Sequence, residues 1–188
     1  MKKFPIEISA RHAHLSQNDL EVLFGKNYTL TATRPLSQSG EFAAKERVDL
    51  IAHHNAILGV RVLGPVRAQT QVEISKSDAY RIGIEAPLKV SGDLAGAVKI
   101  TIRGPKGEIK RSAVIIAKRH AHVSTTTAQK IGLAQNQVIR IRISGPRGGV
   151  LDNVVVRIAP NFCDVVHLDI DEGNAFGVTR EAFGEVVE

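Results

Sequence analysis

The stretch ARHAHLS at residues 10–16 occurs a second time as KRHAHVS at residues 118–124. Each copy follows an apolar run and precedes a short segment with helical character, and its final serine stands where a helix N-cap is expected. Residues two apart on an extended segment point to the same side, so the two histidines of each copy can converge. The repetition of this stretch predicts a chain built from two related units.

A second pair of segments has the same relationship. VEIS at residues 72–75 and VHLD at residues 166–169 each lead into a short helical stretch, and Glu73 to Gly83 spans the same length as His167 to Gly177. The last residue of each segment, a serine or an aspartate, is again a good N-cap. Each unit is therefore predicted to contain one His-x-His turn and one turn of this second kind.

The rest of the sequence favours strands. Residues 98–117 and 138–158 each read as two Val- and Ile-rich strands around a Gly-Pro turn, at 104–107 and at 145–149. Apolar and charged residues alternate along 139–143, which is the pattern of a strand with one buried face. We expect a mostly β protein with short capping helices, built as barrels or sandwiches of short strands.

Composition narrows the class of protein. The 188 residues are 43% hydrophobic and 23% charged, as in ordinary globular proteins, but only 4% aromatic, so the core must be mainly aliphatic. The net charge of +6 points to an anionic partner. We expect no nucleic acid, because long Lys/Arg runs and stacking aromatics are lacking. The single Cys163 excludes an intrachain disulfide, and no membrane segment is expected.

The repeated histidines predict metal binding. Each His-x-His pair needs a third ligand from elsewhere in the chain, and Glu73 and His167 stand at matching places in the two halves. Three protein ligands with an open position are typical of a catalytic metal, and imidazole and carboxylate suit Zn²⁺ as well as Fe, Co or Ni. A single His-x-His is more often ordinary surface chemistry, but two copies in matching contexts favour metal. The predicted ligands are His12, His14 and Glu73 for one ion, and His120, His122 and His167 for the other.

Other polar residues are weaker candidates. Arg67 lies six residues before Glu73, and a guanidinium binds phosphate well, although an isolated arginine is more often a solvated surface residue. His53 and His54 fall outside the repeats and are expected to be loop or strand residues. Cys163, four residues before His167, is an alternative thiolate ligand, but a free cysteine is usually a small buried residue.

The chain resembles the phosphate propanoyltransferase family, the phosphotransacylase type first associated with bacterial microcompartments. The resemblance runs from about Ile6 to Ala175 and rests on long motifs that occur in the same order. These are ISARHAHLS (8–16), PLSQSGEFAAKERV (35–48), VRVLGPVRAQTQVEIS (60–75), SGDLAGA (91–97), KRHAHVS (118–124) and HLDIDEGNA (167–175).

This resemblance implies a fold of two related β-barrel domains packed together, with the first strand in the C-terminal barrel. The expected domains are 1–10 plus 119–188, and 11–118. It also implies reversible exchange between a short-chain acyl-CoA (propionyl-CoA or acetyl-CoA) plus phosphate and acyl phosphate plus CoA. Two zinc ions would occupy the histidine sites named above, and Arg67 falls at the position of the family's phosphate-contacting arginine.

The expected mechanism is a direct transfer. Phosphate near Arg67 and the His120, His122 and His167 metal would attack the thioester, while the other metal would bind the CoA sulfur. Two alternatives are a zinc-dependent hydrolase and a non-catalytic barrel that binds anions or nucleic acid. A homo-oligomer is compatible with the sequence. We expect a cytoplasmic enzyme rather than one of the microcompartment lumen, because the chain begins only a few residues before the first motif.

Overall fold

The computed structural model describes residues 2–53 and 55–187, and the chain divides into two compact units. The central unit is Ala10–Ala117, and the terminal unit combines Met1–Ser9 with Lys118–Glu188. The prediction of a mostly β protein with short helices and two barrels is confirmed. Within the described residues, no helix has the length and apolarity needed to cross a membrane.

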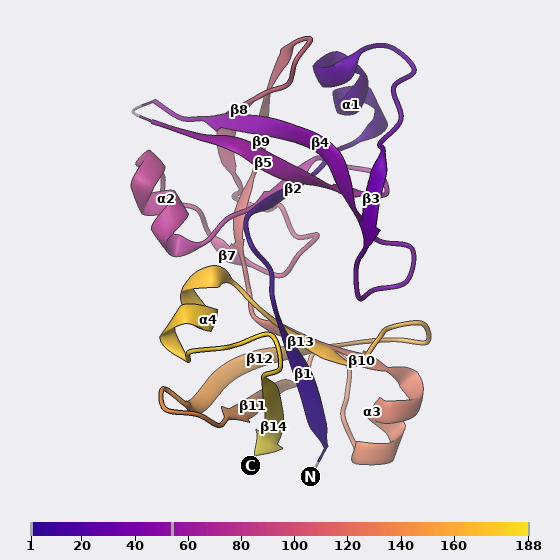
Figure 1. The fold of residues 1–188 in the computed structure, drawn as a ribbon, viewed down its shortest axis with the longest axis vertical. Coiled ribbons are helices and arrows are strands. Elements are labelled where there is room, and N and C mark those ends of the chain that lie inside the picture. Colours follow the sequence, from indigo (N-terminus) through magenta and orange to yellow (C-terminus); the bar gives the residue numbers. More distant parts are fainter. Residues whose placement is uncertain (1, 54, 188) are drawn as a thin grey trace. The chain divides into compact units, whose positions relative to one another are not determined.

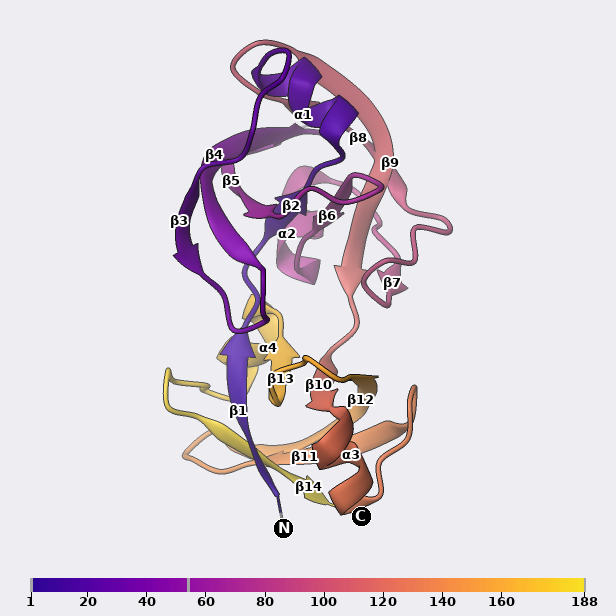
Figure 2. The ribbon, with the colours of Figure 1, turned by 90° about the vertical axis from the view of Figure 1, so that its right-hand side faces the viewer.

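In the described part of the central unit, six strands close into a barrel in the order β4-β5-β2-β6-β9-β8, and β8 pairs back onto β4 (Figure 1; β6 is labelled in Figure 2). β3 and β7 flank this ring. The strands are β2 (His12–His14), β3 (Ala32–Pro35), β4 (Phe42–Ile51), β5 (Ala56–Gly64), β6 (Gln71–Glu73), β7 (Leu88–Lys89), β8 (Val98–Arg103) and β9 (Glu108–Ala117). The helices are α1 (Gln17–Phe24) and α2 (Lys76–Ile82).

The described terminal unit also forms a closed barrel of six strands, in the order β1-β13-β10-β12-β11-β14. The first strand of the chain thus pairs with strands from its C-terminal part. The strands are β1 (Lys3–Ile8), β10 (His120–Ser124), β11 (Val138–Ile143), β12 (Gly149–Ala159), β13 (Val165–Leu168) and β14 (Phe183–Val187). The helices are α3 (Thr125–Ile131) and α4 (Ile170–Ala175).

The two barrels repeat one pattern of strand pairing. β2 runs parallel to β5 and antiparallel to β6, and β10 runs parallel to β12 and antiparallel to β13. β9 is parallel to β6 and antiparallel to β8, just as β1 is parallel to β13 and antiparallel to β14. The strand that leads into each His-x-His therefore belongs to the other unit's barrel, which is why the terminal unit is discontinuous in sequence.

Alternation of apolar and charged residues builds each core. Along β11, the three isoleucines Ile139, Ile141 and Ile143 are buried, whereas Arg140 and Arg142 between them are exposed. Each barrel encloses its own aliphatic cluster, and few aromatics take part. Burial of these side chains supplies the main driving force for folding.

Helix caps define the turns that follow the repeated motifs. Ser16 and Ser124 accept the backbone N–H of Asp19 and Thr127, as predicted. Ser75 and Asp169 form complete capping boxes with Asp78 and Glu172 at the starts of α2 and α4. The sequence predicted each of these serines and this aspartate as an N-cap, so the starts of all four helices in the described residues agree with the prediction.

Asp19 has a further role that the sequence did not suggest. Its buried carboxylate accepts a hydrogen bond from Thr70 Oγ1 at 2.6 Å and pairs with Arg111 Nη2 at 2.6 Å and Nε at 3.1 Å. The hydroxyl of Thr70 also receives the backbone N–H of Ser16 at 3.0 Å. This network connects the start of α1 to β9 and to the residue before β6, and so fixes the first His-x-His turn within the central barrel.

Replacing Arg111 with methionine is expected to lower the free energy of unfolding by about 2 kcal/mol, because the Asp19 carboxylate would stay buried without its cation. Urea unfolding measures the change. Arg103→Met is the matched control on the same hairpin, since Arg103 pairs with Glu108 where both side chains are about half exposed, and such pairs contribute roughly 0–1 kcal/mol. An equal decrease in the free energy of unfolding in the two variants would contradict the structural role of Asp19.

Candidate metal centres

Strand pairing brings the predicted ligands together in each unit. His12 on β2 is the direct partner of Glu73 on β6, and His120 on β10 is the direct partner of His167 on β13. Directly opposed side chains on antiparallel strands lie on one face, close to each other. The second histidine of each motif, two residues further, shares that face. The same register therefore gathers three candidate ligands in each barrel.

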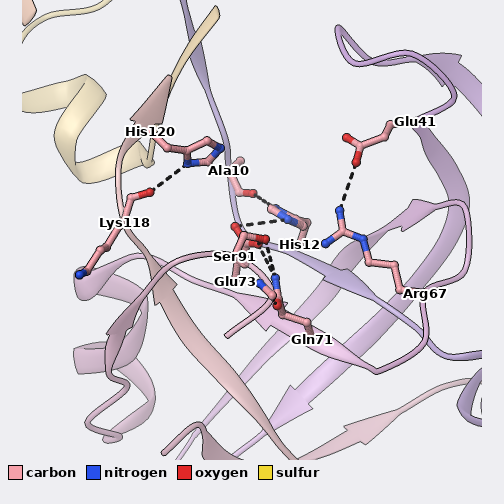
Figure 3. A network of polar contacts seen from close by, with 10 residues as sticks. Ala10, His12, Glu41, Arg67, Gln71, Glu73, Ser91, Lys118 and His120 are labelled. Carbon is pink, nitrogen blue, oxygen red and sulfur yellow. Dashed lines mark hydrogen bonds and ion pairs between the residues drawn. The ribbon is translucent and has the colours of Figure 1, made fainter. Parts of the chain in front are cut away.

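In the central unit, the candidate ligand atoms of His12, His14 and Glu73 lie within 4.8 Å of one another, and all three residues are buried. His12 Nε2 is 3.6 Å from Glu73 Oε2. The other ring nitrogen, His12 Nδ1, lies 2.9 Å from the carbonyl oxygen of Ala10 and donates to it, which leaves Nε2 directed at Glu73 (Figure 3). A metal ligand held by a backbone carbonyl in this way has its tautomer and ring orientation fixed.

His14 is kept neutral by its surroundings. Burial, together with the neighbouring His12 and the positive charge of Arg67, lowers the pKa of His14 to about 3. Its Nδ1 is buried and has no hydrogen-bond partner among the described residues. A neutral imidazole with an unsatisfied buried nitrogen fits a metal ligand, because only the deprotonated ring offers a lone pair.

In the terminal unit, the candidate ligand atoms of His120, His122 and His167 also lie within 4.8 Å of one another. All three side chains are partly exposed, in contrast to the buried central cluster. His120 Nδ1 lies 2.9 Å from the carbonyl oxygen of Lys118, which repeats the contact between His12 and Ala10. Glu7 on β1 is opposite His167, with 3.9 Å between Oε2 and Nδ1.

The two clusters differ in the residue beside the second histidine. In the central unit, Arg67 is close enough to His14 for its charge to lower the pKa of that ring. In the terminal unit, the ring of Phe162 packs against His122 at a tilt of 34°, with 4.2 Å between the ring centroids. Both residues lie in the loop after the strand parallel to the His-x-His strand. The central cluster thus has a cation beside it where the terminal cluster has an aromatic ring.

Arg67 is a one-third exposed side chain anchored at its backbone. Its N–H donates to the carbonyl oxygen of Leu15 at 2.9 Å, directly after the first His-x-His. Its Nη2 contacts Glu41 Oε1 at 3.1 Å (Figure 3). The guanidinium is therefore held next to the central cluster and remains accessible to an anion, which the sequence alone could not show.

The weaker candidates lie elsewhere. His53 is an exposed residue between β4 and β5, and His54 lies outside the described residues. Cys163 is exposed, contrary to the usual burial of a free cysteine, and belongs to neither cluster found among the described residues. Sequence reasoning missed Gln71 and Ser91, which hydrogen-bond Glu73. Gln71 could have been found, because it lies two residues before Glu73 and so shares its face.

The donor sets suit zinc. Two imidazoles with a carboxylate, and three imidazoles, are both ligand sets of catalytic Zn²⁺ sites that keep one position open. The structure brings all six predicted ligands into two groups, while metal binding by these groups stays a prediction. These features define a duplicated β-barrel protein with two candidate metal centres and an arginine beside one of them.

Comparison with known proteins identifies the family to which this duplicated β-barrel protein belongs. A sequence model of the phosphate propanoyltransferase family matches residues 5–179. The phosphate propanoyltransferase of Listeria monocytogenes is 40% identical over 97% of this chain and 86% of its own length. Those of Thermotoga maritima and Shewanella putrefaciens are 45% and 44% identical, over 90% and 94% of this chain and 82% and 84% of their own lengths. The chain belongs to the phosphate propanoyltransferase family and is an acyltransferase.

Proposed function

We propose that this protein is a phosphotransacylase that interconverts a short-chain acyl-CoA plus phosphate with acyl phosphate plus CoA. The acyl group is propionyl or acetyl, which differ by one methylene and are weakly discriminated by an apolar pocket. One observation carries this proposal beyond family membership: the backbone N–H of Arg67 donates to Leu15, directly after His14, and its guanidinium lies near the cluster of His12, His14 and Glu73 (Figure 3). An anion site next to a candidate metal centre is what a phosphate-consuming transferase requires.

Arg67 orients the phosphate. Its guanidinium can donate two parallel hydrogen bonds to phosphate oxygens, and its accessible position allows phosphate to replace Glu41 as its partner. A phosphate held in this way presents an oxygen to the thioester without the entropy cost of a free encounter. This role predicts that Arg67 acts on phosphate and not on the acyl-CoA.

The two clusters hold the cofactors. We propose that His12, His14 and Glu73 bind one Zn²⁺ and that His120, His122 and His167 bind another. When bound, these ions supply positive charge for the phosphate, for the carbonyl oxygen of the thioester and for the departing thiolate. The carbonyl oxygens of Ala10 and Lys118 keep His12 and His120 in one tautomer, so that their Nε2 atoms carry the lone pair.

The transfer is direct. A phosphate oxygen forms a bond to the carbonyl carbon, the carbon–sulfur bond breaks, and the electron pair of that bond leaves with CoA as its thiolate, which takes up the proton that the phosphate releases. No net oxidation or reduction occurs, and the reverse reaction uses the same groups. Rapid CoA release from acyl-CoA in the absence of phosphate, limited to a single turnover, would indicate an acyl-enzyme and contradict direct transfer.

Release of CoA from propionyl-CoA and acetyl-CoA is expected to require phosphate and to yield acyl phosphate in equal amount. A thiol reagent measures CoA, and hydroxylamine trapping measures acyl phosphate. Steady CoA release without phosphate would identify a zinc-dependent hydrolase instead. Binding of anions or nucleic acid that survives chelation and falls steeply with salt, without turnover, would identify a non-catalytic barrel.

Location and assembly stay predictions. A single cysteine and the substrates proposed here agree with a cytoplasmic enzyme, and the proposed partners are acyl-CoA, CoA and phosphate. Gel filtration tests the oligomeric state, and cell fractionation tests the location.

A further inference from the structure

We propose that Gln71 and Ser91 are positioning residues that hold Glu73 as a one-oxygen ligand, so that a coordination position of the central metal centre stays open for the substrate. This inference rests on the proposed metal at His12, His14 and Glu73. The inference explains why that centre would have a position for a substrate ligand. Gln71 and Ser91, on which it depends, do not belong to the cluster of candidate ligands.

One oxygen of Glu73 is engaged by both residues. Gln71 Nε2 donates to Glu73 Oε1 at 2.6 Å, and Ser91 Oγ donates to the same oxygen at 2.7 Å (Figure 3). Gln71 is 2% exposed and Glu73 is 8% exposed. Two short hydrogen bonds to a buried carboxylate oxygen restrict rotation of the carboxylate plane and draw electron density to that oxygen.

The backbone fixes the orientation of the Gln71 amide. The N–H of Gly92 points at Gln71 Oε1 at 2.8 Å, and an N–H can only donate, so the oxygen of the amide must face Gly92. The NH₂ group then faces Glu73 and Ser91, whose Oγ lies 2.9 Å from Nε2. Every donor and acceptor of the amide has a geometric assignment, and the reversed amide would place an oxygen against the Glu73 carboxylate.

The other oxygen faces the centre. Glu73 Oε2 is 3.6 Å from His12 Nε2, inside the group of candidate ligand atoms. A carboxylate can bind a metal through one oxygen or two, and binding through two would use the position that a catalytic site leaves open. Since Oε1 is held by Gln71 and Ser91, we infer that only Oε2 is offered to the metal.

The terminal unit supplies an independent comparison. Val165 occupies the place of Gln71, since Gln71 pairs with His14 as Val165 pairs with His122. The third ligand there is His167, which offers a single nitrogen to a metal and needs no such restraint. The amide is thus present in the barrel where the third ligand is a carboxylate, and a valine replaces it where the third ligand is an imidazole.

The test uses the full chain loaded with Co²⁺, which takes the same donors as Zn²⁺ and reports its coordination by visible absorption. CoA is the probe for the open position, because its thiolate adds a sulfur-to-cobalt band in the near ultraviolet. In Gln71→Met and Ser91→Ala, Glu73 is expected to bind Co²⁺ through both of its oxygens. The visible absorption is then expected to weaken, because the coordination number of the cobalt rises. The dissociation constant of CoA measured from the sulfur band is expected to rise about 10–100-fold.

Two controls separate positioning from general damage. Gln69→Met removes an exposed amide two residues earlier and is expected to leave both signals as in the wild type. Ser91→Thr keeps the hydroxyl and is expected to retain the sulfur band that Ser91→Ala weakens. The inference would be overturned if Co²⁺-loaded Gln71→Met and Ser91→Ala had the spectra and the CoA affinity of the wild type. That result would leave the proposed metal centre in place. Failure of the wild-type protein to bind Co²⁺ would instead overturn the proposed metal centre.

Discussion

Replacing His120 with alanine is expected to remove one of the two proposed metal equivalents and, with it, phosphate-dependent CoA release. The lost imidazole leaves only two ligands, His122 and His167, which are too few for a stable catalytic site. Metal ions contribute several kcal/mol to such reactions, so kcat/KM should fall at least about 10³-fold. Metal analysis of the same samples used for the CoA-release assay measures both effects.

Treatment of the wild-type protein with a chelator should produce the same loss, and added Zn²⁺ should restore activity to the wild-type protein only. His53→Ala is the matched control, because His53 is an exposed histidine outside both clusters. It should keep its metal and its activity. Full activity in a metal-free preparation would contradict the proposed role of both centres at once.

Replacing Arg67 with alanine is expected to weaken the use of phosphate while leaving the protein folded and metal-loaded. Hydrogen bonds to a charged group contribute about 1.5–3 kcal/mol, so kcat/KM for phosphate should fall roughly 10- to 150-fold. The KM for acyl-CoA should change little, because Arg67 is assigned to phosphate. Steady-state kinetics with each substrate varied in turn separates the two effects.

Two further variants sharpen this test. Arg67→Lys keeps the charge but loses the planar fork, so it should recover only part of the loss. Arg103→Ala removes one positive charge from an exposed pair of the same unit and should leave the KM for phosphate unaffected. If the KM for phosphate rose equally in Arg67→Ala and Arg103→Ala, the effect would come from the net charge of the protein, which would contradict phosphate binding by Arg67.

Local patterns predicted the elements correctly for identifiable reasons. The alternation along Ile139–Ile143 and the Gly-Pro turns at 104–107 and 145–149 depend only on neighbouring residues, and the hairpins β8–β9 and β11–β12 follow them. The four N-caps were equally local. Asp19 stands three residues after the N-cap Ser16, a spacing that by itself favours a reciprocal capping box, but its carboxylate turns to Thr70 and Arg111 instead. A contact with a residue 92 positions away outweighs a local one because it neutralises a buried charge.

The sequence by itself determined that the chain is a duplication, which residues are candidate ligands, and which family the chain resembles. Those conclusions rest on spacing and residue type, which are present before folding. Only the tertiary structure decided that His12 faces Glu73 and that His120 faces His167. It also decided that Arg67 lies near His14, and that Gln71 and Ser91 hold Glu73. These relations join strands and loops that are distant in the chain, so strand register and burial, and not local preference, determine them.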